Sequence, residues 1–391
     1  RGSATDGERR AAEYCAGVLA DLGLAPQVET FVGARSAWQP HLIVAFLMLL
    51  SFALYPLRGR VSAWAAAVTA LVALTWEVLE LTFRPNPLRS LIATGSSQNV
   101  IAVLPPRAEH RQDLVLIGHV DTNRAALVFA SNGWVNFWRV TAPVIFFSFC
   151  IQAGLYVAGA VTQWSWAWPA SVPSAFCAAL LTAICLQAES SPYSPGANDN
   201  ASGAGLVLAL AERLASEPLR YTRVWFVNTG CEETKHYGAI DFFHRHAVGF
   251  LHPAVVVFEM LARDGPAWLE REVIIPPFAY RADPGLVALV QRLAATCPEW
   301  RVSPVRILGG HTEMADALRL GIPALTLIGI GPDGAGLGYK GPPLYWHQLG
   351  DTIDQVDRQA MARNYGLAWA FVQAFDASSA RRSYTTIRSS S

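Results

Sequence analysis

The sequence predicts an α/β protein that carries two inserted pairs of apolar helices. Short segments with the alternation of β-strands are separated by segments with helical periodicity, which is typical of an α/β domain. Four long apolar runs interrupt this alternation, and they come in two tight pairs. Acidic and histidine residues follow several of the predicted strands, so the edge of the sheet where these strands end is expected to carry a functional site.

The composition favours a protein that is partly solvated by lipid. Charged residues make up only 15% of the 391 residues, apolar residues make up 52%, and there are 13 tryptophans. Soluble proteins usually contain about 25% charged residues. The formal net charge is zero, which gives no electrostatic reason to expect a nucleic acid or another polyanion as a partner. We therefore expect no nucleic-acid partner.

The chain opens with a helix and a strand. Residues 6–23 place apolar side chains at helical spacing, and Gly23 is a typical helix stop. Residues 27–32 then predict a short strand before the composition changes abruptly.

The first apolar pair consists of Leu42–Leu57 and Val61–Trp76, and we expect it to form a transmembrane hairpin within residues 38–90. Both runs are close to the lower limit of about 17 residues for a membrane-spanning helix. The second run extends further only if Glu77 and Glu80 reach the membrane interface.

The second apolar pair consists of Val140–Val161 and Trp164–Gln187, which we expect to form another transmembrane hairpin within residues 134–190. Both runs are long enough to span a bilayer. Tryptophans cluster near the ends of the runs, as interfacial aromatic residues do: Trp38, Trp64, Trp76, Trp134, Trp138, Trp164, Trp166 and Trp168. The alternative is a set of buried helices in the core of a large soluble enzyme.

A pair of crossings returns the chain to the side from which it started, so each hairpin can interrupt a soluble domain without splitting it. We therefore expect one catalytic domain over residues 1–391 in an integral, multi-pass membrane protein. The basic turn of Arg58, Gly59 and Arg60 favours cytoplasmic hairpin tips and a catalytic domain on the non-cytoplasmic side. Other arginines argue for the opposite orientation: Arg35, Arg84, Arg89 and Arg139.

The remaining chain alternates between strands and helices. Strands are predicted at 99–104, 114–118, 223–228, 254–258, 273–275, 305–308 and 324–328. Helices are predicted at 201–216, 237–246, 284–297, 312–320 and 354–375. Residues 378–391 are rich in Ser and Arg, and we expect a flexible tail there.

Five short motifs contain the residues that can carry chemistry. They are His119 in GHVDT, Asp199 in PGANDNASG, Glu232 and Glu233 in GCEET, Glu259 in VVVFEM, and His347 in YWHQLGDTID. Several of these residues follow predicted strands, so their side chains are expected at one edge of the sheet. Imidazole and carboxylate groups bind zinc and similar metals, and a hydrolytic site also needs a base that is not a ligand.

These motifs resemble those of the M28 peptidases, a family of zinc aminopeptidases, over about residues 6–35, 97–133 and 190–376. PGANDNASG is the most specific element, followed by the paired Glu and the WHQ…DT.D ending. The resemblance implies a phosphorylase/hydrolase-like, three-layer zinc exopeptidase fold, with a mixed sheet and helices on both faces. It also implies two Zn²⁺ ions, although other divalent metals suit the same ligands.

The resemblance assigns a role to each motif residue. His119 would bind one metal, Asp199 would bridge both, and Glu233 and Glu259 would each bind one. His347 would complete the shell of the second metal. Glu232 would be the general base that activates a bridging water, and Asp121 would orient His119. A cis peptide bond is expected between Asp199 and Asn200.

Two departures from the family are visible. The family usually has Asp where this chain has Glu259, which offers the same ligand atoms on a longer side chain. The second hairpin separates His119 from Asp199, which the family usually keeps close in sequence. His311 lies where the family often has a substrate-facing loop, and we treat it as a candidate substrate-binding residue. The glycines Gly334, Gly336 and Gly338 indicate an active-site loop rather than a phosphate loop.

The sequence therefore predicts a membrane-anchored dizinc hydrolase that cleaves peptide bonds as an aminopeptidase. Two alternatives remain open. The substrate can instead be a lipid-like or N-acylated amide that reaches the metals from the bilayer, because one hairpin interrupts the chain between two metal ligands. The chain can also be a non-catalytic module on the same scaffold. Substrate specificity and oligomeric state do not follow from the sequence.

Overall fold

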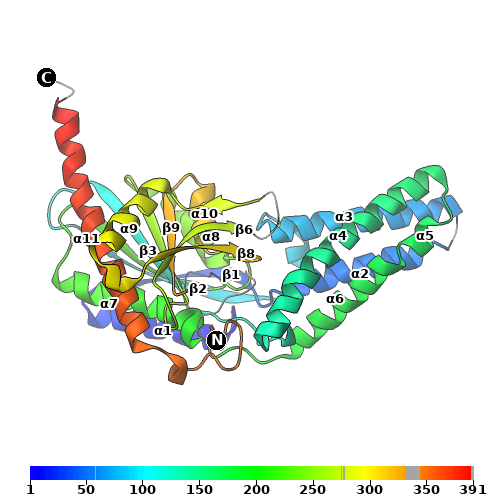
Figure 1. The fold of residues 1–391 in the computed structure, drawn as a ribbon, viewed down its shortest axis with the longest axis horizontal. Helices are drawn as coiled ribbons and strands as arrows, with labels where there is room; N and C mark the ends of the chain where they lie inside the picture. The colour runs from blue at the N-terminus through cyan, green and yellow to red at the C-terminus, as the bar shows by residue number, and fades with distance from the viewer. Residues whose placement is uncertain (58, 274, 276–277, 331–343, 389–391) are drawn as a thin grey trace. The chain divides into compact units, whose positions relative to one another are not determined.

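The computed structural model describes residues 1–57, 59–273, 275, 278–330 and 344–388, with side chains through residue 378. It divides into two compact units (Figure 1). Unit 1 comprises Arg1–Arg35, Thr94–Asn123 and Tyr193–Ser391, and unit 2 comprises Ser36–Ala93 and Arg124–Pro192. Both segments expected to form hairpins, 38–90 and 134–190, fall within unit 2.

Unit 1 is built on a mixed sheet in which the described residues form nine strands, in the order β1-β2-β4-β3-β5-β9-β6-β7 with β8 beside β6. The central strands β4, β3, β5 and β9 run parallel. On one side β2 pairs antiparallel with β4 and β1 pairs antiparallel with β2, and on the other side β6 pairs antiparallel with β9. The strand bounds are β1 Gln27–Ala34, β2 Thr94–Leu104, β3 Gln112–His119, β4 Thr222–Thr229, β5 Ala254–Glu259, β6 Ala267–Val273, β7 Tyr280–Arg281, β8 Ser303–Leu308 and β9 Ala324–Ile328.

Helices cover this sheet in two layers. Contacts link α1, α7, α11 and α9 into one series, while α8 packs against α10 (Figure 1). Their bounds are α1 Asp6–Asp21, α7 Ser202–Ser216, α8 Tyr237–His246, α9 Pro284–Thr296, α10 Met314–Arg319 and α11 Arg358–Arg388. The expected three-layer arrangement, a mixed sheet with helices on both faces, is confirmed.

The centre of unit 1 is fully buried. The residues of β3 from Leu114 to Ile117 are 0% exposed, in keeping with the continuous apolar runs of parallel strands that are covered on both faces. Gly118 follows, and a Cβ added to it would lie 2.7 Å from the backbone nitrogen of Ala204 in α7. The absence of a side chain at this point lets the end of β3 approach the start of α7.

Several predicted elements have different bounds in the structure. The strand predicted at 273–275 is wrong in position, because β6 ends at Val273; Ile274 lies outside the described residues. This strand combines buried Trp268 and Leu269 with the charged residues Glu270 and Arg271, so its pattern does not read as one apolar run. The helix predicted at 354–375 starts later and α11 continues to Arg388, through most of the segment expected to be a flexible tail.

Unit 2 is a bundle of four apolar helices. They are α2 Gln39–Leu54, α3 Gly59–Leu81, α4 Asn132–Thr162 and α6 Val172–Ser190. Neighbouring helices pack in a closed ring, in which α2 contacts α3 and α6, and α4 contacts the same two helices. The second run of the later pair is split into the short helix α5 Ala167–Ala170 and α6. Pro173 lies in the first turn of α6, where its missing N–H costs no hydrogen bond.

Buried polar groups inside unit 2 find partners within the bundle. Gln152 of α4 is 0% exposed, and its side-chain nitrogen donates to the hydroxyl of Ser51 at 2.7 Å and to the carbonyl of Met48 at 2.9 Å. The hydroxyls of Tyr156 and Ser171 lie 2.6 Å apart. The contacts of Gln152 tie α4 to α2 of the first pair, and the contact between Tyr156 and Ser171 ties α4 to the start of α6 within the second pair.

The acidic residues of α3 are paired rather than exposed at an interface. Glu77 accepts from Nδ1 of His41 at 3.0 Å. Glu80 accepts from the side chain of Asn86 at 3.1 Å and lies 3.5 Å from Nε of Arg89. The helix therefore extends to Leu81 because its two carboxylates have imidazole, guanidinium or amide groups beside them.

Three helices in the described part of the chain are long and apolar enough to cross a membrane, namely α3, α4 and α6. The fourth, α2, has 16 residues, whereas a spanning helix needs about 20. The expectation of four transmembrane helices is therefore supported for three of them.

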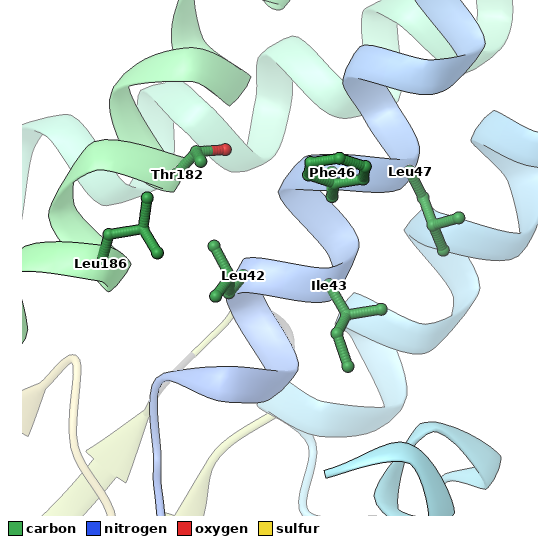
Figure 2. Close-up of a pocket in the computed structure, with 6 residues that line it drawn as sticks. All are labelled: Leu42, Ile43, Phe46, Leu47, Thr182 and Leu186. Carbon is green, nitrogen blue, oxygen red and sulfur yellow. The ribbon is translucent and has the colours of Figure 1, made fainter. Parts of the chain in front are cut away.

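The outer surface of the bundle is apolar. Exposed side chains include Phe46, Val68, Leu71, Val144, Phe147, Ile151 and Phe176. Between α2 and α6 lies an open apolar groove of about 320 Å³, lined by Leu42, Ile43, Phe46, Leu47, Thr182 and Leu186 (Figure 2). An apolar surface of this kind is typical of a lipid-facing bundle.

Candidate metal centre

The predicted ligands come together at one edge of the sheet in unit 1. His119 and Glu259 are the last residues of β3 and β5, which are neighbouring parallel strands. Glu232 and Glu233 follow β4, on the other side of β3. Asp199 lies just before α7. The start of this helix lies close to the end of β3 because Gly118 has no side chain.

The first group contains His119, Asp199 and Glu259. Nε2 of His119 lies 3.5 Å from Oδ1 of Asp199 and 3.5 Å from Oε1 of Glu259. All three side chains are buried. The glutamate that replaces the expected aspartate therefore reaches the same place as the other two residues.

The second group contains Asp199, Glu233 and His347. Nε2 of His347 lies 3.3 Å from Oδ2 of Asp199 and 3.1 Å from Oε2 of Glu233. Asp199 thus presents one oxygen to each group. The two groups share this carboxylate, which is the arrangement that a bridging ligand requires.

These spacings fit metal ions. Zinc binds imidazole nitrogen and carboxylate oxygen at about 2.0–2.2 Å, so two ligands of one tetrahedral ion lie about 3.3–3.5 Å apart. The distances around His119 and His347 lie at or near that range. The residues therefore fit a pair of metal ions, each held by one imidazole and two carboxylates with Asp199 in common.

The electrostatics of the two ligand groups also favour the binding of cations. Burial, together with the nearby charges of Asp199 and Glu232, raises the pKa of Glu259 to about 8, although His119 opposes the shift. Burial and the same two carboxylates raise the pKa of Glu233 to about 7 against the effect of His347. Buried carboxylates that repel one another ionise readily only when a positive charge lies between them.

Asp121 holds the first ligand and the paired glutamates in place. Its Oδ1 lies 3.4 Å from Nδ1 of His119, so it can orient that ring as predicted. The backbone N–H groups of Glu232 and Glu233 donate to its two oxygens at 3.1 and 3.2 Å, and the hydroxyl of Ser3 donates at 2.6 Å. Asp121 therefore fixes the strand end and the loop after β4 relative to each other.

The loop that carries Asp199 is anchored by side chains of its own motif and of the last motif. The backbone N–H groups of Asn198 and Asp199 donate to Asp351 at 2.7 and 3.0 Å. The side chain of Asn200 donates to the carbonyl of Phe258 at 2.8 Å and to Glu259 at 3.2 Å. The expected cis peptide bond between Asp199 and Asn200 is present.

Glu232 lies beside the first group without belonging to either. Its Oε2 lies 3.8 Å from Nε2 of His119, and its Oε1 lies 3.1 Å from Nε2 of His236. A carboxylate that adjoins the ligands but is held by another residue can accept a proton from water at the metals. This is the position that the predicted general base requires.

His311, the candidate substrate-binding residue, lies after β8 with its ring edge-on to Tyr280 at 5.2 Å. Burial and the nearby charges of His236 and Arg319 lower its pKa to about 2, so the ring is neutral. The contact of His311 with a substrate stays a prediction. The predicted loop at Gly334, Gly336 and Gly338 lies outside the described residues.

Sequence reasoning missed residues that support the site. Asn123 donates to Glu233 from its backbone at 2.9 Å and from its side chain at 3.0 Å. His236, which lies outside the five motifs, contacts Glu232. Glu313 is buried, and its pKa is raised to about 8 by burial and by Glu232. The signal for His236 is its position four residues after the base; no comparable signal marks Glu313.

Comparison with known proteins supports these motifs. Residues 187–372 match the model of the family described as "Peptidase family M28". This range contains all the motifs except the first, GHVDT. No curated protein matches the sequence.

Solved structures share the fold at low sequence identity. A zinc aminopeptidase from Bacillus subtilis is 12% identical, covers 95% of this chain and 90% of its own, and has a TM-score of 0.53. An aminopeptidase from Aneurinibacillus sp. strain AM-1 is 14% identical over 95% and 89%, with a TM-score of 0.53. A glutaminyl cyclase from Porphyromonas gingivalis is 15% identical over 95% and 91%, with a TM-score of 0.52.

Proposed function

We propose that this chain, which matches the model of peptidase family M28 over residues 187–372, is a membrane-anchored hydrolase with two zinc ions. In this proposal it cleaves peptide bonds as an aminopeptidase. The observation that carries the proposal is the pair of ligand groups that share Asp199, with Glu232 beside them. One of the similar proteins is a zinc aminopeptidase, which favours zinc over other metals that accept the same ligands.

Each residue of the site has a part in this function. His119 and Glu259 would hold one ion, Glu233 and His347 the other, and Asp199 both. The bound ions would supply Lewis-acid activation of the scissile carbonyl and of water. Glu232 would take a proton from the attacking water at Oε2 and return it to the leaving amine. Asp121 would keep His119 oriented throughout.

Unit 2 would anchor the enzyme in a bilayer. Its exposed apolar side chains and the lengths of α3, α4 and α6 support membrane insertion. We extend this to a multi-pass anchor in which α2 is the fourth crossing helix, with the catalytic unit on the non-cytoplasmic side. Cysteine accessibility to a membrane-impermeant reagent, measured at a cysteine introduced near Gly59, tests the sidedness.

Metal content tests the proposal directly. Detergent-purified wild-type protein should contain two zinc ions per chain, and Asp199→Ala should lose both because it removes the shared ligand. Glu259→Ala should retain one ion. One zinc in the wild type would contradict the two-metal site, and none would favour a non-catalytic module on this scaffold.

A second candidate keeps the metal chemistry but changes the substrate to a lipid-like or N-acylated amide. The observation that favours it is the membrane unit itself: the residue after Asn123, which holds Glu233, is the first residue of unit 2. A bilayer-anchored enzyme meets amphiphilic substrates at high local concentration.

The two candidates are separated by a substrate panel in liposomes. Peptides with a free N-terminus, peptides with N-terminal glutamine and N-acyl amides should be compared at equal concentration. Cleavage of the free peptides alone supports the aminopeptidase. Cleavage of the acyl amides alone supports the second candidate, and release of cyclised N-termini would indicate the activity named for the glutaminyl cyclase.

A further inference from the structure

One carboxylate oxygen of the proposed general base faces the metal groups, and the other contacts a histidine. Oε2 of Glu232 faces His119, whereas Oε1 lies 3.1 Å from Nε2 of His236. The two oxygens therefore have different surroundings. A glutamate side chain has three rotatable bonds, and a contact at Oε1 restricts the last of them.

His236 is itself held at its other nitrogen. Its Nδ1 lies 2.6 Å from Oδ2 of Asp316, and Oδ1 of Asp316 lies 3.2 Å from Nη1 of Arg319. Arg319 also donates from Nε to the hydroxyl of Tyr280 at 2.7 Å. A continuous series of contacts thus runs from the base through His236 and Asp316 to Arg319, on α10.

The imidazole has carboxylates at both nitrogens, and carboxylates accept hydrogen bonds. The ring therefore fits the site as a donor at Nε2 and at Nδ1 together. Burial disfavours the charged ring, but the carboxylates of Asp316 and Glu232 raise the pKa of His236 well above its ordinary value. These carboxylates therefore favour the form of the ring that carries both N–H groups.

The backbone at His236 is also unusual. Its φ is 57°, in the left-handed region that disfavours side chains with a β-carbon. Its N–H closes a turn by donating to the carbonyl of Glu232 at 2.9 Å, and α8 begins at the next residue. Such conformations persist where the surrounding structure over-determines them, and they cluster at functional sites.

We propose that His236, clamped by Asp316, is a positioning residue that holds Oε1 of Glu232 so that Oε2 faces the metal groups. This inference rests on the proposed function, in which Glu232 is the base. The N–H donor of His236 keeps the carboxylate of Glu232 in one orientation before the reaction begins. This is the advantage of preorganised groups in catalysis. Positioning of this kind affects kcat more than substrate binding.

The test uses two substitutions that each keep one of the two nitrogens. In His236→Gln the amide nitrogen can take the place of Nε2, and in His236→Asn it can take the place of Nδ1. We expect His236→Asn to lower kcat by about 10–100-fold, the usual effect of losing a supporting contact, with KM and zinc content unchanged. His236→Gln should recover most of the loss, and Asp316→Asn should fall between the two.

His246 provides a matched control. It lies at the other end of α8, and its Nε2 contacts a carboxylate, Oε2 of Glu29, at 3.0 Å. His246→Asn and His246→Gln should leave kcat unchanged. Thermal unfolding of every variant shows which substitutions alter folding; if His236→Asn does not fold, His236→Gln and Asp316→Asn carry the test.

Several outcomes overturn the inference. Equal loss in His236→Asn and His236→Gln would mean that the ring matters only for packing, and full activity in both would mean that the contact is idle. Loss of zinc in either variant would place His236 in metal binding. Persistent activity of Glu232→Gln would instead refute the proposed base itself. A low-field ¹H–¹⁵N signal of His236 that moves in Glu232→Gln should be seen even without a known substrate, and a signal that does not move would refute the contact.

Discussion

In unit 2 the buried carboxylates of Glu77 and Glu80 lie beside His41 and Arg89, whereas in unit 1 the carboxylates around Asp199 lie beside one another. The first arrangement is complete within the polypeptide, since each carboxylate has an imidazole, guanidinium or amide group beside it. The second has more carboxylates than imidazoles can neutralise. A buried excess of one charge indicates an ionic ligand, while a balanced set indicates structural pairing.

Among the changes that test this difference between the units, removal of metal should have the largest effect on activity and stability. Chelation should abolish turnover and lower the Tm of unit 1, because the carboxylates around Asp199 then repel one another without a cation. A ligand present at about 1,000 times its Kd contributes about 4 kcal/mol to stability. Activity and thermal unfolding should be followed with a chelator and after zinc is restored. Unchanged values of both would mean that the acidic cluster needs no metal.

Glu232→Gln should have the next largest effect. It removes the proton acceptor but no metal ligand, so kcat should fall by about 10²–10⁴-fold while the zinc content stays at the wild-type value. Zinc analysis and steady-state kinetics measure the two effects separately. Glu13→Gln, at an exposed residue paired with Arg9, is the control and should retain full activity. A loss of zinc in Glu232→Gln would make Glu232 a ligand rather than a base.

In unit 2, Glu80→Ala should reduce the stability of the protein without changing its catalytic activity. The substitution leaves Asn86 and Arg89 without this carboxylate, and a buried polar group that loses its partner costs about 1–3 kcal/mol. We expect a lower Tm in detergent with normal zinc content and normal kcat. Zinc loss in this variant would show that Glu80 of unit 2 also affects metal binding, which would contradict its purely structural role.

Glu272 gives a smaller, pH-dependent effect. It is buried in β6 and belongs to neither metal group, and burial raises its pKa to about 8 although Thr312 donates to it at 2.9 and 3.0 Å. Because the folded pKa lies above the unfolded value, the stability it contributes is complete below about pH 4.5 and is lost as the pH rises through about 8. Glu272→Gln cannot ionise.

The Tm of Glu272→Gln relative to wild type should therefore increase by a few degrees between pH 5 and pH 9. Thermal unfolding of both proteins across this range measures the difference. A Tm difference that is constant with pH would mean that Glu272 ionises in the folded protein as it does in the unfolded chain.

The class of fold could be predicted from the sequence, and so could the residues that the structure brings together around Asp199. His119 and Glu259 end parallel strands and Glu233 follows another, and parallel strands present their carboxyl ends at one edge of a sheet. His119 and Glu259 illustrate this, because β3 and β5 are neighbours in the sheet. The mixed sheet with two helical layers is also the one that the resemblance implied.

Contacts between residues far apart in the chain could not be predicted in the same way. Asp316 is separated from His236 by 80 positions and belongs to no motif, so its 2.6 Å contact has no sequence signal. The length of α3 depended on whether Glu77 and Glu80 find partners, and His41 and Arg89 lie outside the apolar run. The position of β6 was misjudged because a strand that mixes buried and charged residues has no simple periodicity.

The two insertions into unit 1 leave and return at adjacent points. Ala34 pairs with Thr94 where β1 and β2 meet, and the carbonyl of Asn123 accepts from the N–H of Ser194 at 2.9 Å. Each gap in the chain of unit 1 is therefore short enough for a tight turn to close. Removal of either insertion would therefore leave the strand pairing of unit 1 intact, so the sheet and its acidic edge depend on neither insertion for their connectivity.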